Sequence, residues 1–121
     1  MTPPKTYQLL IELLRPLHLA VGALGHIQLP AGRYIYTGSA RRNFEARIAR
    51  HTSWAENHQR PRHWHIDYLL AAPGTTVAGI RRYTEDECDI QQRTPGTVLI
   101  PGFGATDCRA GCGSHLKYLG K

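Results

Sequence analysis

The sequence predicts a small α+β domain with a central, mainly antiparallel sheet flanked by helices. Its 121 residues, 41% of them hydrophobic, are enough for one compact core and too few for two domains. Short β-rich segments separated by Gly and Pro turns alternate with segments of helical periodicity. We therefore expect residues 1–121 to form a single domain.

The first part of the chain predicts strands. Residues 6–14 alternate well enough for a buried strand, which Pro16 ends. Residues 21–29 contain two glycines and are typical of a bent strand or a hairpin, and residues 30–32 turn the chain into a β-rich strand at 33–37. We expect these three strands to be antiparallel neighbours.

A helix follows directly. Gly38 breaks the strand, and Ser39 is a good N-cap for a helical pattern that continues to about His51. With Phe44 set at zero and 100° per residue, Ile48 falls at about 40°, His51 at about −20° and Arg47 at about −60°. Arg47 and His51 thus border the apolar face that must pack on the sheet.

The second part of the chain continues the alternation. A polar loop at 52–62 leads to a short helix at 63–71, which the Pro-Gly pair at 73–74 stops. Residues 75–83 are β-branched enough for another strand. Residues 85–93 predict a short helix with acids at its favourable amino end, closed by the Thr-Pro-Gly run at 94–96.

Tyr36, Arg47 and His51 form a combination suited to phosphodiester chemistry. A strand that passes directly into a helix brings a phenol, a guanidinium and an imidazole to one small cleft, where they suit a phosphate and its attacking water. The competing structural interpretation is ordinary: Tyr is common in strands, and Arg at a helix edge is usually solvated or snorkelling. His51 has its own alternative, a favourable position near the carboxyl end of its helix.

The charge balance favours a nucleic-acid partner. The formal net charge is +6, and twelve of the fifteen basic residues are Arg, which suits bidentate phosphate contacts. One region holds seven arginines against Glu45 and Glu56 and predicts a positive surface. Those arginines are Arg33, Arg41, Arg42, Arg47, Arg50, Arg60 and Arg62. We expect nucleic-acid contacts from Arg33, Ser39, Arg41, Arg42 and Arg50.

Several motifs resemble one family. The run Tyr36-Thr37-Gly38, with Arg47 and His51 following, resembles the second half of the GIY-YIG nuclease signature. The segments at 63–70 (HWHIDYLL), 87–88, 102–108 and 114–116 (SHL) resemble the small DUF123 or Uri-like family, a branch related to GIY-YIG nucleases and sometimes attached to base-excision repair enzymes. The resemblance covers nearly the whole chain and implies a GIY-YIG-like fold.

That resemblance also implies roles for individual residues. A tyrosine is the general base in GIY-YIG enzymes; Tyr36 matches the second signature tyrosine and Tyr7 is the best match to the first, and both stay candidates. Positive charge near the phenol, from Arg47 or a cation, would favour the phenolate. The wide spacing from Tyr7 to Tyr36 implies an inserted amino-terminal hairpin around residues 21–29. His115, in the SHL segment, is a further candidate for contact with nucleic acid.

A divalent cation, Mg²⁺ or Mn²⁺, is the implied cofactor. Mg²⁺ takes oxygen ligands and often only one or two from the protein. Glu87, at the start of a short helix, matches the family's metal-binding Glu, although an acid at a helix start is stabilising without any metal. Asp67 is the second candidate, and the pair it forms with His63 at helical spacing is more simply a hydrogen bond that anchors a core helix.

The cysteines support a different, weaker hypothesis. Cys108, Cys112 and His115, with Cys88 as a fourth ligand, suit tetrahedral zinc by residue type, but their spacing is not the strongest zinc pattern and we expect no structural zinc. Three cysteines, an odd number, agree with a reducing cytoplasm. The apolar runs fall below the roughly 18 residues of a spanning helix, and we expect no membrane association.

The sequence therefore predicts a metal-dependent endonuclease that hydrolyses DNA phosphodiester bonds, structure-directed and related to repair, with branched or single-stranded DNA as its substrate. The competing class is a non-catalytic nucleic-acid-binding module that accompanies a repair enzyme. The third class is a zinc-stabilised interaction domain.

Overall fold

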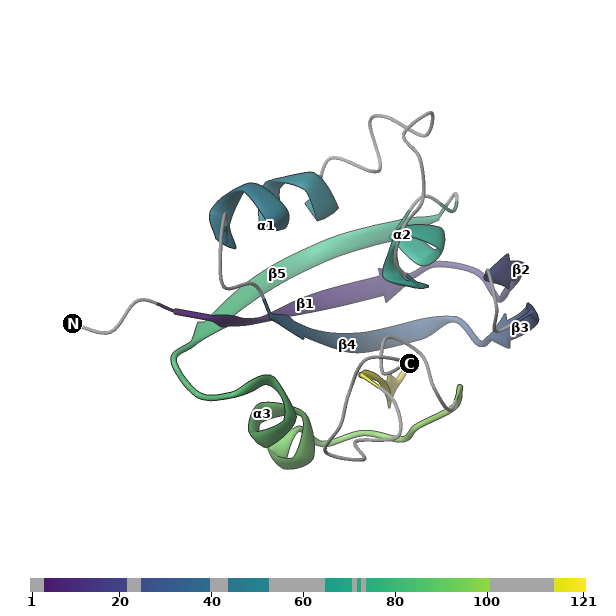
Figure 1. The fold of residues 1–121 in the computed structure, drawn as a ribbon. Helices are drawn as coiled ribbons and strands as arrows, with labels where there is room; N and C mark the ends of the chain where they lie inside the picture. Colours follow the sequence, from purple (N-terminus) through teal and green to yellow (C-terminus); the bar gives the residue numbers. More distant parts are fainter. Residues whose placement is uncertain are drawn as a thin grey trace.

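The fold is a four-stranded antiparallel sheet with helices on both faces, seen in a computed structural model (Figure 1). The structure describes residues 4–21, 25–39, 44–52, 65–70, 72, 74–100 and 115–121. The strands run in the order β5-β1-β4-β6, and every neighbouring pair is antiparallel. The predicted α+β class and the mainly antiparallel sheet are thus confirmed.

The sheet is built around β1 (Thr6–Leu13) and β4 (Gly32–Ser39), which pair along their whole lengths from Thr6 with Ser39 to Leu13 with Gly32. The edge strands are β5 (Thr75–Tyr83) and β6 (Leu116–Gly120). The strands expected at 6–14, 33–37 and 75–83 are therefore present. β6 was not predicted from the sequence.

One predicted strand pairing is wrong. β3 (Gly25–Leu29), in the described part of the segment expected at 21–29, does not pair with β1 or β4. It pairs with β2 (Leu17–Val21) in a separate two-stranded sheet. β3 begins at Gly25 with a φ of 76°, a backbone conformation that glycine adopts without steric cost. Ile27 and Leu29 are buried and belong to the main core, whereas the alternating positions His26 and Gln28 are exposed. The small sheet therefore packs against the main core through one face of β3.

The hydrophobic core lies on the face of the sheet that α1 (Phe44–Thr52) and α2 (His65–Leu70) cover (Figure 1). Strand alternation sends Tyr7, Leu9, Ile11 and Leu13 of β1 into this core. Ile48 of α1 is buried and Phe44 packs against the cluster, which confirms the predicted apolar face of the first helix. Ile66, Leu69 and Leu70 of α2 complete the layer.

The opposite face carries α3 (Glu87–Arg93), as Figure 1 shows. The helix begins two residues later than expected and ends at Arg93 as predicted, with Thr94 as its C-cap. Lys117 of β6 donates to the carbonyl oxygens of Gln91 (2.9 Å) and Thr94 (2.7 Å), so a cation satisfies the carboxyl end of α3. This contact fixes α3 against the sheet. No helix within the described residues has the length and apolar character to cross a membrane.

Candidate active site

Three of the predicted site residues meet at one end of the sheet. Ser39 is the last residue of β4, Glu87 is the first residue of α3, and His115 directly precedes β6. The Ser39 hydroxyl donates to Glu87 Oε2 at 2.8 Å, and His115 Nδ1 lies 2.6 Å from Glu87 Oε1. Glu87 thus has a polar partner at each carboxylate oxygen.

The backbone explains why these residues meet. The amide of Thr37 donates to the carbonyl oxygen of His115 at 3.0 Å, and β6 then pairs with β4 from Leu116 onward. Strand alternation places Ser39 on the same face as Thr37, toward α3. Residues 39, 87 and 115 are far apart in sequence, and the sheet pairing is what brings them together.

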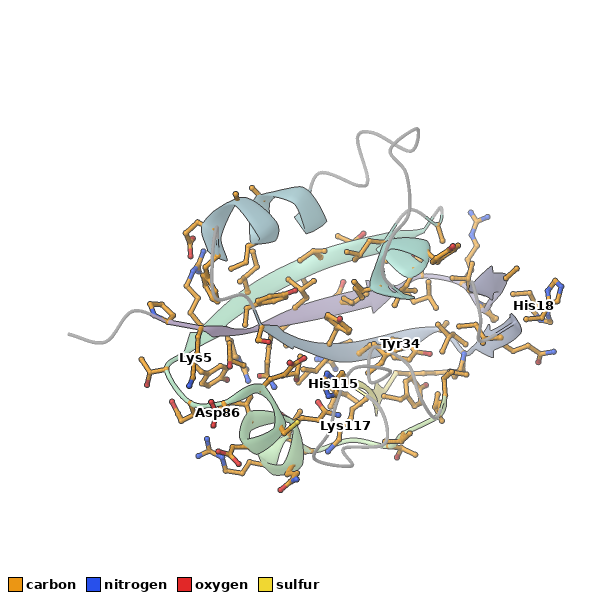
Figure 2. The ribbon with its side chains drawn as sticks, viewed as in Figure 1. Lys5, His18, Tyr34, Asp86, His115 and Lys117 are labelled. Carbon is orange, nitrogen blue, oxygen red and sulfur yellow. The ribbon has the colours of Figure 1, made fainter. Side chains whose placement is uncertain are left out.

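Within this Ser39–Glu87–His115 cluster, the His115 side chain is more deeply buried than the Glu87 side chain. The His115 side chain is 2% exposed, whereas the Glu87 side chain retains 26% of its exposure. A buried imidazole beside a carboxylate holds that carboxylate in one orientation, and the solvent-facing part of Glu87 stays accessible (Figure 2 labels His115 on the α3 side of β4). The arrangement is a positioned carboxylate at the start of a helix.

Ser39, expected as an N-cap, has a different partner. It belongs to β4, and its hydroxyl donates a hydrogen bond to Glu87, which lies 48 residues further along the chain. α1 begins at Phe44, and residues 40–43 lie outside the described residues.

Tyr7 and Tyr36 lie on the other face of the sheet. Tyr7 is 2% and Tyr36 6% exposed, and both belong to the core cluster; the Tyr7 ring makes an edge contact with Phe44 at 5.8 Å between centroids. The Tyr7 hydroxyl sits over Gly38, where a Cβ would lie 2.5 Å from it. Gly38 and Ser39, neighbours at the end of β4, therefore face Tyr7 on one side of the sheet and Glu87 on the other.

The remaining predicted residues are placed only in part. Arg47, Arg50 and His51 belong to α1, but their side chains are not among those described, and Asp67 has the same status in α2. Arg41, Arg42 and His63 lie outside the described residues, as do Cys108 and Cys112 of the zinc hypothesis. Arg33 is exposed on β4, on the α3 side and away from the cluster. Cys88 follows Glu87 in α3 and is partly exposed.

The donor set of the cluster suits a hard cation. Glu87 offers carboxylate oxygens and Ser39 a hydroxyl oxygen, and Mg²⁺ is often held by one or two carboxylates with water completing its shell. Across the described part of the chain, no group of three or more His, Cys, Asp and Glu side chains is close enough together to hold a metal. A cation here would depend on Glu87 as its only described carboxylate.

A buried polar network beside α3 was not predicted from the sequence. The Gln8 amide donates to the Thr37 and Thr94 hydroxyls at 3.1 and 2.6 Å, and Tyr83 donates to Gln8 Oε1 at 3.1 Å. Gln8 is a polar residue on an otherwise buried strand, and this is the sequence signal that could have indicated the network.

The fold is a small α+β domain, and the cluster places a partly exposed carboxylate at the end of its sheet. The family described as "Domain of unknown function DUF123" matches residues 6–121, and the chain belongs to that family. No curated protein and no solved structure matches the chain.

Proposed function

We propose that the protein is a metal-dependent endonuclease of GIY-YIG type that hydrolyses DNA phosphodiester bonds, with Glu87 as its metal ligand. The observation that carries the proposal is the carboxylate of Glu87, oriented by Ser39 and His115 and still partly exposed. A metal-holding carboxylate needs this combination of fixed orientation and access. The separate β2–β3 sheet would be the hairpin inserted into a GIY-YIG-like fold.

The proposed division of labour places the reaction at the end of β4. Tyr7 is the better of the two candidate bases, because its hydroxyl reaches Gly38 beside Ser39 and so lies at the same end of the sheet as Glu87. Tyr7 would accept the proton of the attacking water, and Arg47 would neutralise phosphate charge with His51 in support. A divalent cation at Glu87 would supply Lewis-acid stabilisation of the leaving oxygen.

The proposal includes a partner and a setting. The net charge of +6, mostly Arg, supports DNA as the partner. A branched or single-stranded substrate, a role in repair and a cytoplasmic location belong to the same proposal.

A non-catalytic nucleic-acid-binding module is the second candidate, and the burial of both tyrosine rings favours it. Phenols that pack in a core have a sufficient structural role without any chemistry. In this alternative, Glu87 and its two partners only anchor α3 to the sheet.

A cleavage assay separates the two functions. Nicked, flapped and single-stranded DNA are incubated with the protein and Mg²⁺ or Mn²⁺, with a chelator control. We expect metal-dependent cleavage that Glu87→Gln and Tyr7→Phe each reduce by about 100-fold or more, because each removes a group used in the transition state. The matched control is Asp89→Asn, an exposed acid on the same helix.

The outcomes assign the function. DNA binding without metal-dependent cleavage by the parent protein would establish the binding module. Equal cleavage by the parent and Glu87→Gln would remove Glu87 from the site. If Tyr36→Phe reduces the cleavage rate more than Tyr7→Phe does, Tyr36 and not Tyr7 is the general base.

A further inference from the structure

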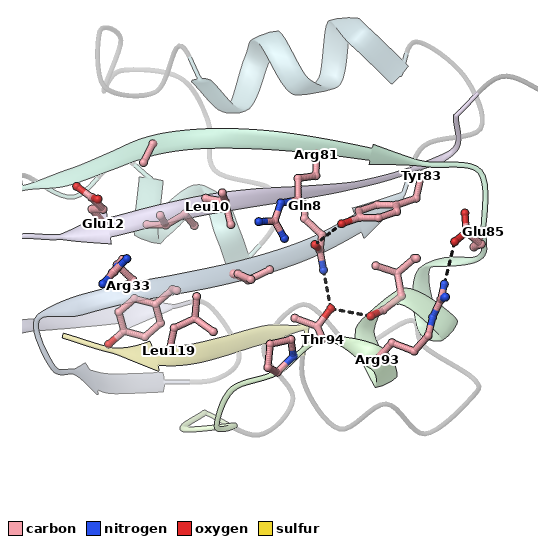
Figure 3. Close-up of a pocket in the computed structure, with 16 residues that line it drawn as sticks. Gln8, Leu10, Glu12, Arg33, Arg81, Tyr83, Glu85, Arg93, Thr94 and Leu119 are labelled. Carbon is pink, nitrogen blue, oxygen red and sulfur yellow. Dashed lines mark hydrogen bonds and ion pairs between the residues drawn. The ribbon is translucent and has the colours of Figure 1, made fainter.

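A pocket lies between the sheet and α3, and Glu87 is not among its lining residues. The pocket has a volume of about 540 Å³, within the range of pockets that hold small organic ligands, and is far larger than an inorganic ion needs. None of the Ser39–Glu87–His115 residues lines it. Figure 3 shows side chains of β1, β4, β5, β6 and α3 around it.

Two of the guanidinium groups that line the pocket, those of Arg33 and Arg81, have no ion-pair partner among the residues that the structure describes. Arg93, at the α3 edge, is already paired with Glu85 at 2.9 Å. A guanidinium without a carboxylate partner beside an apolar surface is a strong site for a phosphate group.

The lining changes along the strands. At one end, Arg81 faces Gln8 in the β1–β5 ladder, next to the hydrogen-bonded Gln8–Tyr83–Thr94 network. At the other end, Arg33 faces Glu12 in the β1–β4 ladder and so places a donor beside an acceptor.

The β1–β4 ladder places the apolar pair Leu10 and Ile35 between the two ends, and both side chains line the pocket. Ile90 and Leu119 add further apolar lining. Gln8 and Glu12 are four residues apart on one strand, so the two polar ends are separated by roughly 13 Å.

We propose that this pocket binds a nucleoside monophosphate, with the phosphate on Arg81, the sugar and base over the apolar middle, and the base edge at Arg33 and Glu12. The separation of the ends is comparable with the length of a mononucleotide. A base edge carries donors and acceptors side by side, which matches the Arg33 and Glu12 end, whereas a second phosphate there would be repelled by Glu12. The ligand is either a free nucleotide or the terminal nucleotide of a nucleic-acid strand, because both present the same chemistry.

Titration calorimetry of the full chain tests the proposal with deoxyadenosine monophosphate, unphosphorylated deoxyadenosine and inorganic phosphate as probes. We expect the monophosphate to bind at least tenfold more tightly than either fragment, since only it occupies both ends. Arg81→Gln should weaken the monophosphate at least tenfold, the usual effect of losing a charge-assisted hydrogen bond. It should leave deoxyadenosine unaffected.

Two further variants keep the test independent of folding defects. Ala78→Phe fills the pocket from an exposed position of β5 without changing any charge and should abolish binding, and Phe suits a strand. The matched control is Arg82→Gln, at the position next to Arg81. The Arg82 guanidinium is exposed, donates hydrogen bonds to Glu45 of α1 and does not line the pocket. It should bind the monophosphate like the parent.

The outcomes are decisive. Absence of binding by all four common deoxynucleoside monophosphates at millimolar concentration overturns the proposal, as does binding that Arg81→Gln and Ala78→Phe both leave unchanged. Competition by an oligonucleotide with a terminal phosphate assigns the ligand to strand ends, and its absence assigns it to free nucleotides. Glu87→Gln should not alter this binding, so the pocket and the proposed nuclease fail or succeed separately.

Discussion

The Ser39 hydroxyl and the Glu87 carboxylate are joined by a hydrogen bond of 2.8 Å, which connects the last residue of β4 to the first residue of α3. Because the core holds β4 in place, this bond fixes the orientation of the Glu87 side chain. The loop before α3 is further tied down by an ion pair between Lys5 and Asp86.

Removing the Ser39 hydroxyl should loosen this junction. We expect Ser39→Ala to lower the free energy of unfolding by about 1 kcal/mol, the usual contribution of one partly buried hydrogen bond. Urea denaturation followed by circular dichroism measures the change. Ser39→Thr keeps the hydroxyl and serves as the control; a loss as large as that of Ala would mean that the hydroxyl contributes nothing.

Gly38 should tolerate no side chain while Tyr7 is present. A Cβ at Gly38 would lie 2.5 Å from the Tyr7 hydroxyl oxygen and 2.6 Å from its ring carbon Cζ. Gly38→Ala should therefore cost roughly 1–3 kcal/mol by overpacking. Thermal unfolding of Gly38→Ala in the parent and in a Tyr7→Leu background measures the coupling, since the smaller Leu side chain leaves room for the methyl group. Equal costs in both backgrounds would contradict the predicted contact.

The Gln8 network should be sensitive to loss of its central amide. Gln8→Leu leaves the Tyr83 hydroxyl and the Thr37 and Thr94 side chains without their shared partner, so we expect a loss of about 1–3 kcal/mol in the free energy of unfolding. Chemical denaturation gives this value. The exposed Gln92 of α3 is the matched control, and Gln92→Leu should change stability by less than about 0.5 kcal/mol.

Tyr34 should make the protein sensitive to alkali. Burial, and secondarily the neighbouring Tyr118, raise the pKa of the Tyr34 phenol, whose hydroxyl donates to the carbonyl of Pro30. The folded state therefore favours the protonated phenol. Its contribution to stability is complete below the unfolded pKa of about 10 and is lost as the pH rises above that value.

Unfolding free energies measured between neutral pH and strong alkali test this sign. The parent should lose stability above about pH 10 more steeply than Tyr34→Phe, which has no phenol to ionise at that position. Tyr68→Phe, at a partly buried position of α2, is the control for general tyrosine ionisation. Parallel curves for the parent and Tyr34→Phe would contradict the assignment.

The ion pair that joins α1 to β5 should be visible in a titration. Hydrogen bonds from Arg82 at 2.9 and 2.7 Å lower the pKa of the Glu45 carboxyl. Arg82→Gln should return that pKa toward its usual value, as followed by the carboxyl carbon shift in NMR. Because both groups are exposed, we expect little change in stability near neutral pH. An unchanged Glu45 pKa would show that the pair does not persist in solution.

Local signals in the sequence predicted much of the fold. Alternation along β1 identified a buried strand, and the positions of Phe44 and Ile48 identified the face of α1 that packs on the sheet. The acids before Ile90 marked the start of α3, with Glu87 as its first residue. Each of these features depends on residues only a few positions apart, which a pattern records directly.

Features that depend on distant pairing were not predicted or were predicted wrongly. β6 is a five-residue strand that exists as an edge partner of β4, and β3 was assigned to the main sheet although β2 is its partner. The side-chain partners of Ser39 and Gln8 lie tens of residues away. Such contacts are invisible to a local pattern because they form only when the sheet has assembled.

The sequence by itself determined the class of fold, the main strands and helices, the positive charge and the identity of Glu87 as the acid at the start of α3. The tertiary structure alone decided that Ser39 and His115 contact the Glu87 carboxylate. It also decided that the rings of Tyr7 and Tyr36 pack on the sheet face opposite Glu87, and that Arg33 and Arg81 line one pocket. The physical reason is that periodicity and turn residues act over a few positions. The face and neighbours of a side chain depend instead on strand register across the whole chain.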